Sequence, residues 1–144
     1  MACAAALASL FALTAVHAQS DALMAAAARE PQAFVTASGL VYRLLHEGNG
    51  DTPEAGDTVQ VHYRGTFADG REFDSSYKRN QPSVFPLKGV IKCWTEGVQL
   101  MKVGGKAKLT CPAALAYGAR GAGSAVPPNT TLQFEIELLA ITTP

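Results

Sequence analysis

The dominant pattern along the chain is an alternation of apolar and polar positions, which is typical of strands with one buried and one exposed face. The alternation is clearest from Val59 to Phe67, where an apolar residue or glycine occupies every second position. Shorter strand-like segments cover residues 40–45, 72–75, 83–85, 106–111 and 132–138. The Ala-Asp-Gly sequence at 68–70 is typical of a hairpin turn. The pattern therefore predicts five or six short antiparallel strands.

One segment has a different period. From Ile91 to Met101 the apolar residues are spaced by three, four and three positions, which places them on one face of a short amphipathic helix. Gly104 and Gly105 follow and are expected to cap this helix. Residues 117–130 form a loop rich in glycine, alanine and proline, long enough to suggest a function. A single helix against one face of an antiparallel sheet indicates an α+β fold.

The first part of the chain has another composition. Residues 4–16 are a continuous run of small and apolar residues, shorter than the roughly 20 residues of a membrane-spanning helix. Val16 and Ala18 form a small-residue cleavage site, so residues 1–18 are interpreted as a signal peptide; a buried N-terminal helix is the alternative, because no basic residue precedes the run. Residues 19–35 are expected to form a short alanine-rich helical arm, and residues 36–144 the folded domain.

The charge balance narrows the classes of partner. Lys plus Arg number 12 and Asp plus Glu number 12, so the formal net charge is zero. A neutral chain without a basic run is poorly suited to bind nucleic acid or an anionic membrane. The apolar fraction of 48% excludes a disordered chain and is sufficient for a hydrophobic core.

Motifs for covalent or metal chemistry are absent from the sequence. There is no Gly-x-Ser-x-Gly nucleophile elbow, and no glycine-rich loop with the lysine that binds phosphate. Beyond the leader only His46 and His62 are present, without the spacing of metal ligands. No cofactor and no metal is therefore expected.

Aromatic residues are the most distinctive group in the sequence. They come from separate segments and fall on inward strand phases, on the helix or in the long loop: Tyr63, Phe67, Phe73, Phe85, Trp94, Tyr117 and Phe134. They form either an ordinary core or an aromatic binding pocket. Asp74 directly follows Phe73 on the opposite phase, and one carboxylate beside several aromatic rings favours the pocket.

Many motifs in a single order carry a family resemblance. These motifs are Val61-His62-Tyr63-Arg64-Gly65, Asp69-Gly70, Phe73-Asp74-Ser75-Ser76, Gly89-Val90-Ile91, Trp94-x-Glu96-Gly97, Val103-Gly104, Ala116-Tyr117-Gly118, Pro127-Pro128-Asn129-x-Thr131-Leu132 and Phe134-x-x-Glu137-Leu138. Over residues 36–142 the chain resembles the FKBP family of peptidyl-prolyl cis–trans isomerases, which binds the macrolides FK506 and rapamycin. Residues 38–43 and 75–79 are similar to its periplasmic macrophage-infectivity-potentiator-like branch.

The resemblance implies a fold and a site. The fold is α+β, an antiparallel five- to six-stranded half-barrel sheet wrapped around one short α-helix, with the site between helix and sheet. The implied catalytic residues are Tyr63, Phe73, Asp74, Tyr117 and Phe134. The implied substrate-binding residues are Phe85, Val90, Ile91, Trp94, Arg79 and Val126. Among them, Trp94 is expected at the floor, Val126 at the side that closes the pocket, and Arg79 as the charge partner of Asp74.

The resemblance also implies an activity and partners. The activity is isomerisation of X–Pro bonds in unfolded or exported polypeptides, as a periplasmic folding catalyst. A non-catalytic periplasmic chaperone or peptide-binding module with the same pocket is the alternative. FK506 and rapamycin are candidate ligands, whereas nucleic-acid binding and stable membrane insertion are not expected. Because the arm before the domain is short, we expect a monomer.

Two features depart from the family pattern. Ser83 stands where many relatives carry phenylalanine, which makes one pocket wall thinner. Cys93 and Cys111 stand where small and β-branched apolar residues are usual. They are either two buried thiols that act as small apolar side chains or a disulfide that limits the unfolded chain. A Cα separation above about 7 Å would exclude the disulfide.

Overall fold

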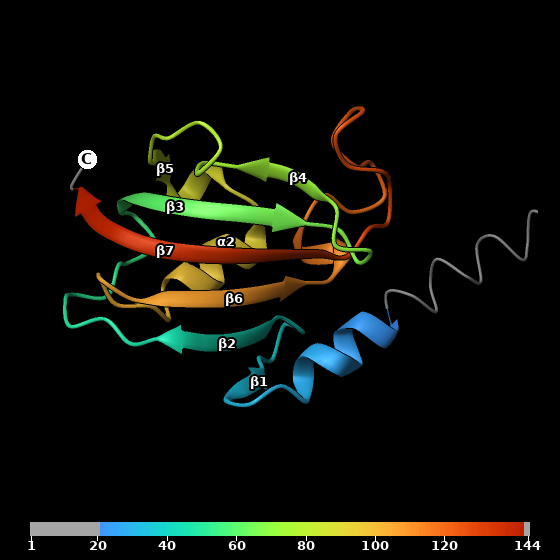
Figure 1. Ribbon diagram of the computed structural model, residues 1–144, viewed down its shortest axis with the longest axis horizontal. Helices are drawn as coiled ribbons and strands as arrows, with labels where there is room; N and C mark the ends of the chain where they lie inside the picture. The colour runs from blue at the N-terminus through green and yellow to red at the C-terminus, as the bar shows by residue number, and fades with distance from the viewer. Residues whose placement is uncertain (1–20, 143–144) are drawn as a thin grey trace, which may run out of the picture.

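The computed structural model describes residues 21–142 of the 144-residue chain (Figure 1). The signal peptide predicted for residues 1–18 lies outside the described residues. Residues 21–28 are helical. The named elements that follow are β1 (Ala33–Val35), β2 (Val41–His46), β3 (Thr58–Thr66), β4 (Glu72–Ser75), β5 (Ser83–Pro86), the 3₁₀ turn η1 (Leu87–Gly89), α2 (Lys92–Val98), β6 (Lys106–Cys111), the 3₁₀ turn η2 (Ala113–Leu115) and β7 (Leu132–Thr142).

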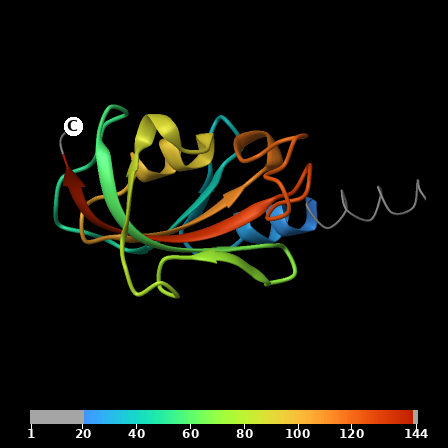
Figure 2. The same cartoon turned by 90° about the horizontal axis from the view of Figure 1, so that it is seen from above.

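The strands form one antiparallel sheet. Its order is β1-β2-β6-β7-β3-β4, and β5 pairs with β3 outside this path. The sheet curves, and α2 lies on one side of it, as Figure 2 shows. The predicted class, an antiparallel half-barrel with one short helix against it, is therefore confirmed. The N-terminal edge adds β1, so the sheet has seven strands.

Burial follows the alternation that the sequence predicts. On β3, Val59 and Val61 are fully buried and Tyr63 is nearly so, whereas Arg64 is exposed. On β6, Leu109 is fully buried and faces the core. Burying an aliphatic side chain of this size stabilises the folded chain by about 1.5–3 kcal/mol. A register shift of one residue would expose this entire apolar set, so the alternation fixes the register of the central strands.

The helix is shorter than its apolar spacing predicts. It ends at Val98 rather than Met101, because the amides of Leu100 and Met101 donate to the carbonyls of residues three positions earlier, 97 and 98. This tight turn still buries the Met101 side chain, so the spacing of apolar residues continues beyond the helix. The expected glycine cap is wrong: Gly104, with a φ of +92°, lies in the turn that leads into β6.

The N-terminal segment contributes a strand that the sequence analysis assigned to the helical arm. Strand β1 pairs with β2, with Ala33 opposite Arg43. Glu30 fastens this segment to the sheet, since its carboxylate pairs with Arg43 on β2 and with Lys108 on β6, the latter at 3.0 Å. A strand of three residues is too short to show a period, which explains why the pattern did not reveal it.

Replacing Glu30 by glutamine is expected to loosen residues 21–35 while leaving the domain folded. The change removes the charge from two ion pairs whose side chains are mostly shielded from solvent, and the loss is expected to be about 1 kcal/mol. Amide hydrogen exchange should therefore accelerate in residues 21–35. The control is Glu47→Gln, which removes a more exposed, 3.7 Å pair with Lys102; equal exchange in both variants would contradict the fastening role of Glu30.

Candidate active site

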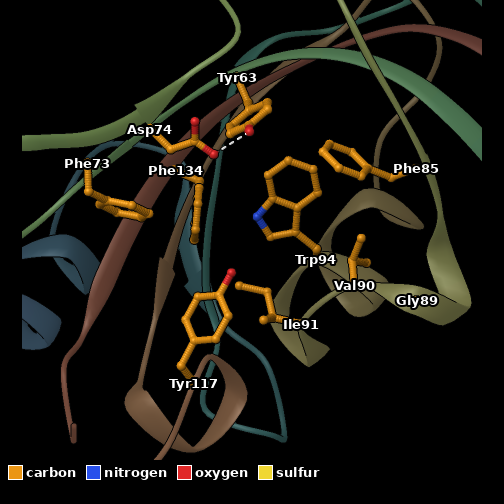
Figure 3. A pocket seen from close by; sticks show the side chains of 10 residues that line it. All are labelled: Tyr63, Phe73, Asp74, Phe85, Gly89, Val90, Ile91, Trp94, Tyr117 and Phe134. Carbon is orange, nitrogen blue, oxygen red and sulfur yellow. Dashed lines mark hydrogen bonds between the residues drawn. The ribbon is translucent and has the colours of Figure 1, made fainter. Parts of the chain in front are cut away.

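A cavity of about 280 Å³ opens between α2 and the sheet (Figure 3). Its wall is formed mainly by aromatic and aliphatic side chains from β3, β4, β5, β7 and α2, and by the segments before α2 and after η2. The lining residues are Tyr63, Phe73, Asp74, Phe85, Gly89, Val90, Ile91, Trp94, Tyr117 and Phe134. The sheet and the helix thus place residues that are distant in sequence around one apolar space.

The floor of the cavity is Trp94, which α2 presents to the sheet. Its ring lies nearly perpendicular to three others, those of Tyr63 at 5.1 Å, Phe134 at 5.4 Å and Phe85 at 5.5 Å between centroids. Such edge-to-face pairs contribute about 0.5–1.5 kcal/mol each beyond the area that they bury. The indole is therefore held on three sides, which gives a stiff floor.

The indole nitrogen of Trp94 has no protein partner within the described residues. Trp94 is only 4% exposed, and its Nε1 is buried without a hydrogen bond there. In Figure 3 this nitrogen is turned toward the space between Phe134 and Tyr117. An unpaired buried donor costs free energy.

The polar edge of the cavity is a triad of Asp74, Tyr63 and Arg79. The Tyr63 hydroxyl donates to Asp74 Oδ2, and Arg79 Nη1 donates to Oδ1 at 2.7 Å. Arg79 Nη2 also donates to the Tyr63 oxygen at 3.1 Å. The carboxylate is therefore paired in charge and fixed in orientation, so the rim of the apolar cavity carries no free negative charge.

The titration of this triad follows from its contacts. Burial, the largest single effect, raises the pKa of Asp74, but hydrogen bonds from Tyr63 and Arg79, the charge of Arg79 and the Ser75 amide together bring that pKa below its usual value. Burial, and then the hydrogen bond to Asp74, raises the pKa of Tyr63. At neutral pH the carboxylate is ionised and the hydroxyl keeps its proton, which is the arrangement that the hydrogen bond requires.

Tyr117 and Ile91 line the cavity on the side opposite Asp74. Tyr117 reaches in from the segment after η2, and burial together with the charge of Asp74 raises its pKa, so its hydroxyl stays a donor. The Ile91 backbone N–H makes no hydrogen bond within residues 21–142. Val90 and Ile91 both have extended backbone conformations. This edge can therefore donate hydrogen bonds to the carbonyl groups of an extended peptide.

Nine of the eleven residues implied as catalytic or substrate-binding line this cavity, and two of them do not. Arg79 lies just outside, in contact with Asp74. Val126 is only 2% exposed and packs in the core, because paired hydrogen bonds with Ala122 fold the loop over it. It is not among the residues that line the cavity, so its place at the side that closes the pocket stays a prediction. Ser83 also lies off the wall, where its hydroxyl accepts a 3.4 Å hydrogen bond from Arg79.

Gly89 lines the cavity although the sequence analysis gave it no role. It precedes Val90 and Ile91, and a Cβ at this position would lie 3.2 Å from Pro86 Cγ. The absence of a side chain therefore avoids a close contact with Pro86 at the edge of the cavity. The Gly-Val-Ile motif was the available signal, but a glycine contributes no chemical group that a search for site residues would select.

A disulfide joins the helix of the floor to the sheet. Cys93, at the start of α2, is bonded to Cys111 at the end of β6, with 5.8 Å between their Cα atoms. Both residues are fully buried. Of the two alternatives for these cysteines, the structure has the cross-link, which ties the residue next to Trp94 to the sheet.

Two other features are absent from residues 21–142. No group of three or more histidine, cysteine, aspartate or glutamate side chains is arranged to hold a metal ion in that part of the chain. No helix there is both long and apolar enough to cross a membrane.

Comparisons with known proteins agree with this geometry. The family model of the FKBP-type peptidyl-prolyl cis-trans isomerases matches residues 50–139. The chain is 50% identical over 126 residues to FkpA of Aeromonas hydrophila, covering 88% of this chain and 47% of that protein. It is 42% identical over 123 residues to Mip of Coxiella burnetii, covering 85% of this chain and 54% of that protein. The chain thus spans about half the length of these curated relatives.

A solved structure shows the same fold. The crystal structure of FkpA from Escherichia coli superposes with a TM-score of 0.87 at 43% sequence identity, covering 90% of this chain and 61% of that one. The family match, residues 50–139, contains every strand and helix that surrounds the cavity, apart from the last residues of β7. By sequence and by fold, the chain belongs to the family of FKBP-type peptidyl-prolyl cis-trans isomerases.

Proposed function

We propose that the protein accelerates cis–trans isomerisation of X–Pro bonds and that the cavity over Trp94 is its active site. The observation that carries this proposal is an open aromatic cavity with donors at one edge and a charge-paired carboxylate at the other. The volume of about 280 Å³ suits a small ring with its flanking amides. We also propose that this space is the binding site for FK506 and rapamycin.

The reaction explains why the site needs no nucleophile. Rotation about an X–Pro bond is opposed by about 18–20 kcal/mol of lost amide resonance, and takes tens to hundreds of seconds without a catalyst. No covalent bond breaks, so a site accelerates it by binding the twisted amide better than either planar form. The twisted amide is less polar than the planar one, and an apolar cavity therefore disfavours the planar ground states relative to it.

Each part of the cavity has a role in this scheme. The proline ring packs on Trp94, enclosed by the rings of Phe85 and Phe134. The Ile91 N–H and the Tyr117 hydroxyl hold carbonyl groups of the peptide on either side of the rotating bond. These contacts hold the flanking chain still while the C–N bond turns, which lowers the entropic part of the barrier. Asp74 acts through its charge and its hydrogen bonds, and not as a base.

We further propose that the protein works in the periplasm on exported polypeptides. The disulfide between Cys93 and Cys111 supports an oxidising compartment, because cytosolic thiols are generally kept reduced. The apolar segment at residues 4–16, with its small-residue cleavage site, supports export. N-terminal sequencing of the protein from a periplasmic fraction tests this, and a start before residue 19 would contradict cleavage after Ala18.

Replacing Asp74 by alanine is expected to lower kcat/KM on an X–Pro peptide by about tenfold, since it removes the acceptor that orients Tyr63 and leaves Arg79 unpaired. A protease-free isomerisation assay measures the rate, and circular dichroism checks the fold. The matched control is Asp69→Ala, which also breaks a 2.7 Å pair with an arginine, Arg71, but on the exposed hairpin turn. Equal activity in both variants would contradict the role of Asp74.

The same assay, repeated over a range of pH, tests the ionisation of Asp74. Because the pKa of Asp74 lies below its usual value, its carboxylate stays ionised from about pH 5 to pH 8. The contribution of Asp74 to wild-type activity is therefore constant in this window, and is lost only as the pH falls through the lowered pKa. A chaperone without catalysis would slow aggregation of unfolded chains but leave the isomerisation rate unchanged at every pH.

A further inference from the structure

A second depression adjoins the active-site cavity and shares one residue with it. This depression, called here the lysine groove, lies over η1 and the outer face of α2. It is lined by Lys88, Val90, Lys92, Thr95, Glu96 and Gln99. Val90 lines the cavity as well, so one side chain forms the boundary between the two spaces. A peptide that leaves the cavity over Val90 therefore enters the lysine groove.

The lysine groove carries an excess of positive charge. Lys88 and Lys92 are exposed, and neither forms an ion pair with a described residue. The Lys88 side chain passes 3.8 Å from the position of a Cβ on Gly56, yet no carboxylate of that turn reaches it. The single acid of the groove is Glu96, so two lysines face one carboxylate.

The carboxylate of Glu96 is already engaged. Its Oε1 accepts hydrogen bonds from Thr36, at 3.2 Å, and from Ser38. These bonds tie Glu96 to the loop that leads into β2 and not to either lysine. The opposite rim of the cavity differs, because Arg79 is paired there with Asp74 at 2.7 Å. Positive charge is therefore available to a ligand on the Val90 side of the cavity and neutralised on the Asp74 side.

The backbone between the two spaces suits an extended peptide. Val90 has φ −110° and ψ 172°, and Ile91 has φ −60° and ψ 152°. An extended segment presents its own amide groups, and a second extended chain can lie along it. A substrate whose carbonyl accepts from the Ile91 N–H would place a neighbouring side chain beside Lys88 and Lys92.

We propose that the lysine groove selects substrates with an acidic residue close to the isomerised proline, so that the preferred substrate class is an acidic X–Pro segment. This inference rests on the proposed isomerase function and adds a specificity to it. Both lysines are exposed, so the attraction is moderate and is screened by salt. It acts on capture of the substrate, and it should therefore change KM more than kcat.

A scan of charge in a proline peptide tests this proposal. A neutral host peptide with one X–Pro bond carries glutamate, glutamine or lysine at single positions on each side of the bond, and kcat/KM is measured for the full chain. At one or more positions the peptide with glutamate should have a kcat/KM about threefold higher than the peptide with glutamine, and the peptide with lysine should have a lower kcat/KM than the peptide with glutamine. The preference should disappear near 1 M salt, where charges further apart than about 3 Å are screened.

Variants separate the groove from other causes. The double substitution Lys88→Gln with Lys92→Gln should bring the glutamate-to-glutamine ratio to about one, since it removes the charge that generates the preference. Lys106→Gln is the control, because Lys106 lies on β6 and lines neither space; it should keep the wild-type ratio. The inference is overturned if the preference for glutamate persists in the double variant, or if the wild type shows no such preference. A wild type that fails to isomerise even the neutral peptide overturns the proposed function instead.

Discussion

Replacing Gly65 by alanine is expected to lower kcat/KM on an X–Pro peptide by about tenfold or more and to destabilise the fold by about 1–3 kcal/mol. Gly65 lies in β3, directly behind the aromatic wall of the cavity. A Cβ there would lie 2.6 Å from Phe73 Cζ and 2.9 Å from Phe134 Cε1, both closer than carbon atoms approach. One methyl group therefore displaces two of the rings that shape the site.

The direction of that displacement explains the size of the effect. Phe73 and Phe134 pack edge to face at 5.7 Å, and Phe134 packs in the same way on Trp94. Strand β3 lies behind the rings of Phe73 and Phe134, and the cavity lies in front of them. The rings can therefore move away from the added methyl group only into the cavity. Rings that move this way narrow the space for the proline and disturb the shape that favours the twisted amide.

A matched substitution separates crowding in the site from crowding elsewhere. Gly50→Ala would place a Cβ 2.7 Å from Val103 Cβ, and neither residue lines the cavity. It should lower the free energy of unfolding but leave kcat/KM of the folded protein unchanged. Urea denaturation measures the first quantity and the isomerisation assay the second. If Gly65→Ala kept wild-type kcat/KM, the aromatic wall would not determine the rate.

The strands were predictable from sequence because their signal is local. Alternation along β3 reports directly which side chains face inward, and Val59, Val61 and Tyr63 are buried as it predicts. Strand β1 was missed because three residues contain no period. The end of α2 was misplaced because the tight turn after Val98 buries Met101 as another helical turn would. A pattern of burial thus identifies faces more reliably than it identifies element ends.

The site was predictable only in part, for a different reason. A residue at an inward-facing position of a strand or helix can belong either to the core or to a pocket, and the pattern does not distinguish the two. For Trp94 and Phe134 the resemblance to a family supplied that distinction. It also placed Val126 at the side that closes the pocket, where the residue is buried and does not line the cavity. It did not assign the lysine groove, because Lys88 and Lys92 acquire their place beside the cavity from the turn between β5 and α2.

Removing the disulfide between Cys93 and Cys111 is expected to lower the free energy of unfolding by about 3 kcal/mol, because the bond closes a loop of 18 residues in the unfolded chain. The double variant Cys93→Ala with Cys111→Ala removes the cross-link and leaves small apolar side chains at two fully buried positions. Urea denaturation is followed through Trp94, the only tryptophan of the chain, so the signal comes from the floor of the cavity.

The reduced wild type distinguishes the cross-link from packing. With reductant present the wild type keeps both sulfur atoms in the core and loses only the covalent bond. It should therefore be less stable than the oxidised protein. It should be more stable than the double variant, because that variant also lacks the buried volume of the two sulfur atoms. Reductant should leave the double variant unchanged. If the oxidised wild type and the double variant unfolded at the same urea concentration, the bond would contribute nothing to the fold. Reduction could also lower kcat/KM at urea concentrations where the protein is still folded. In that case the link from Cys93 to β6 would be holding Trp94 in place for the reaction.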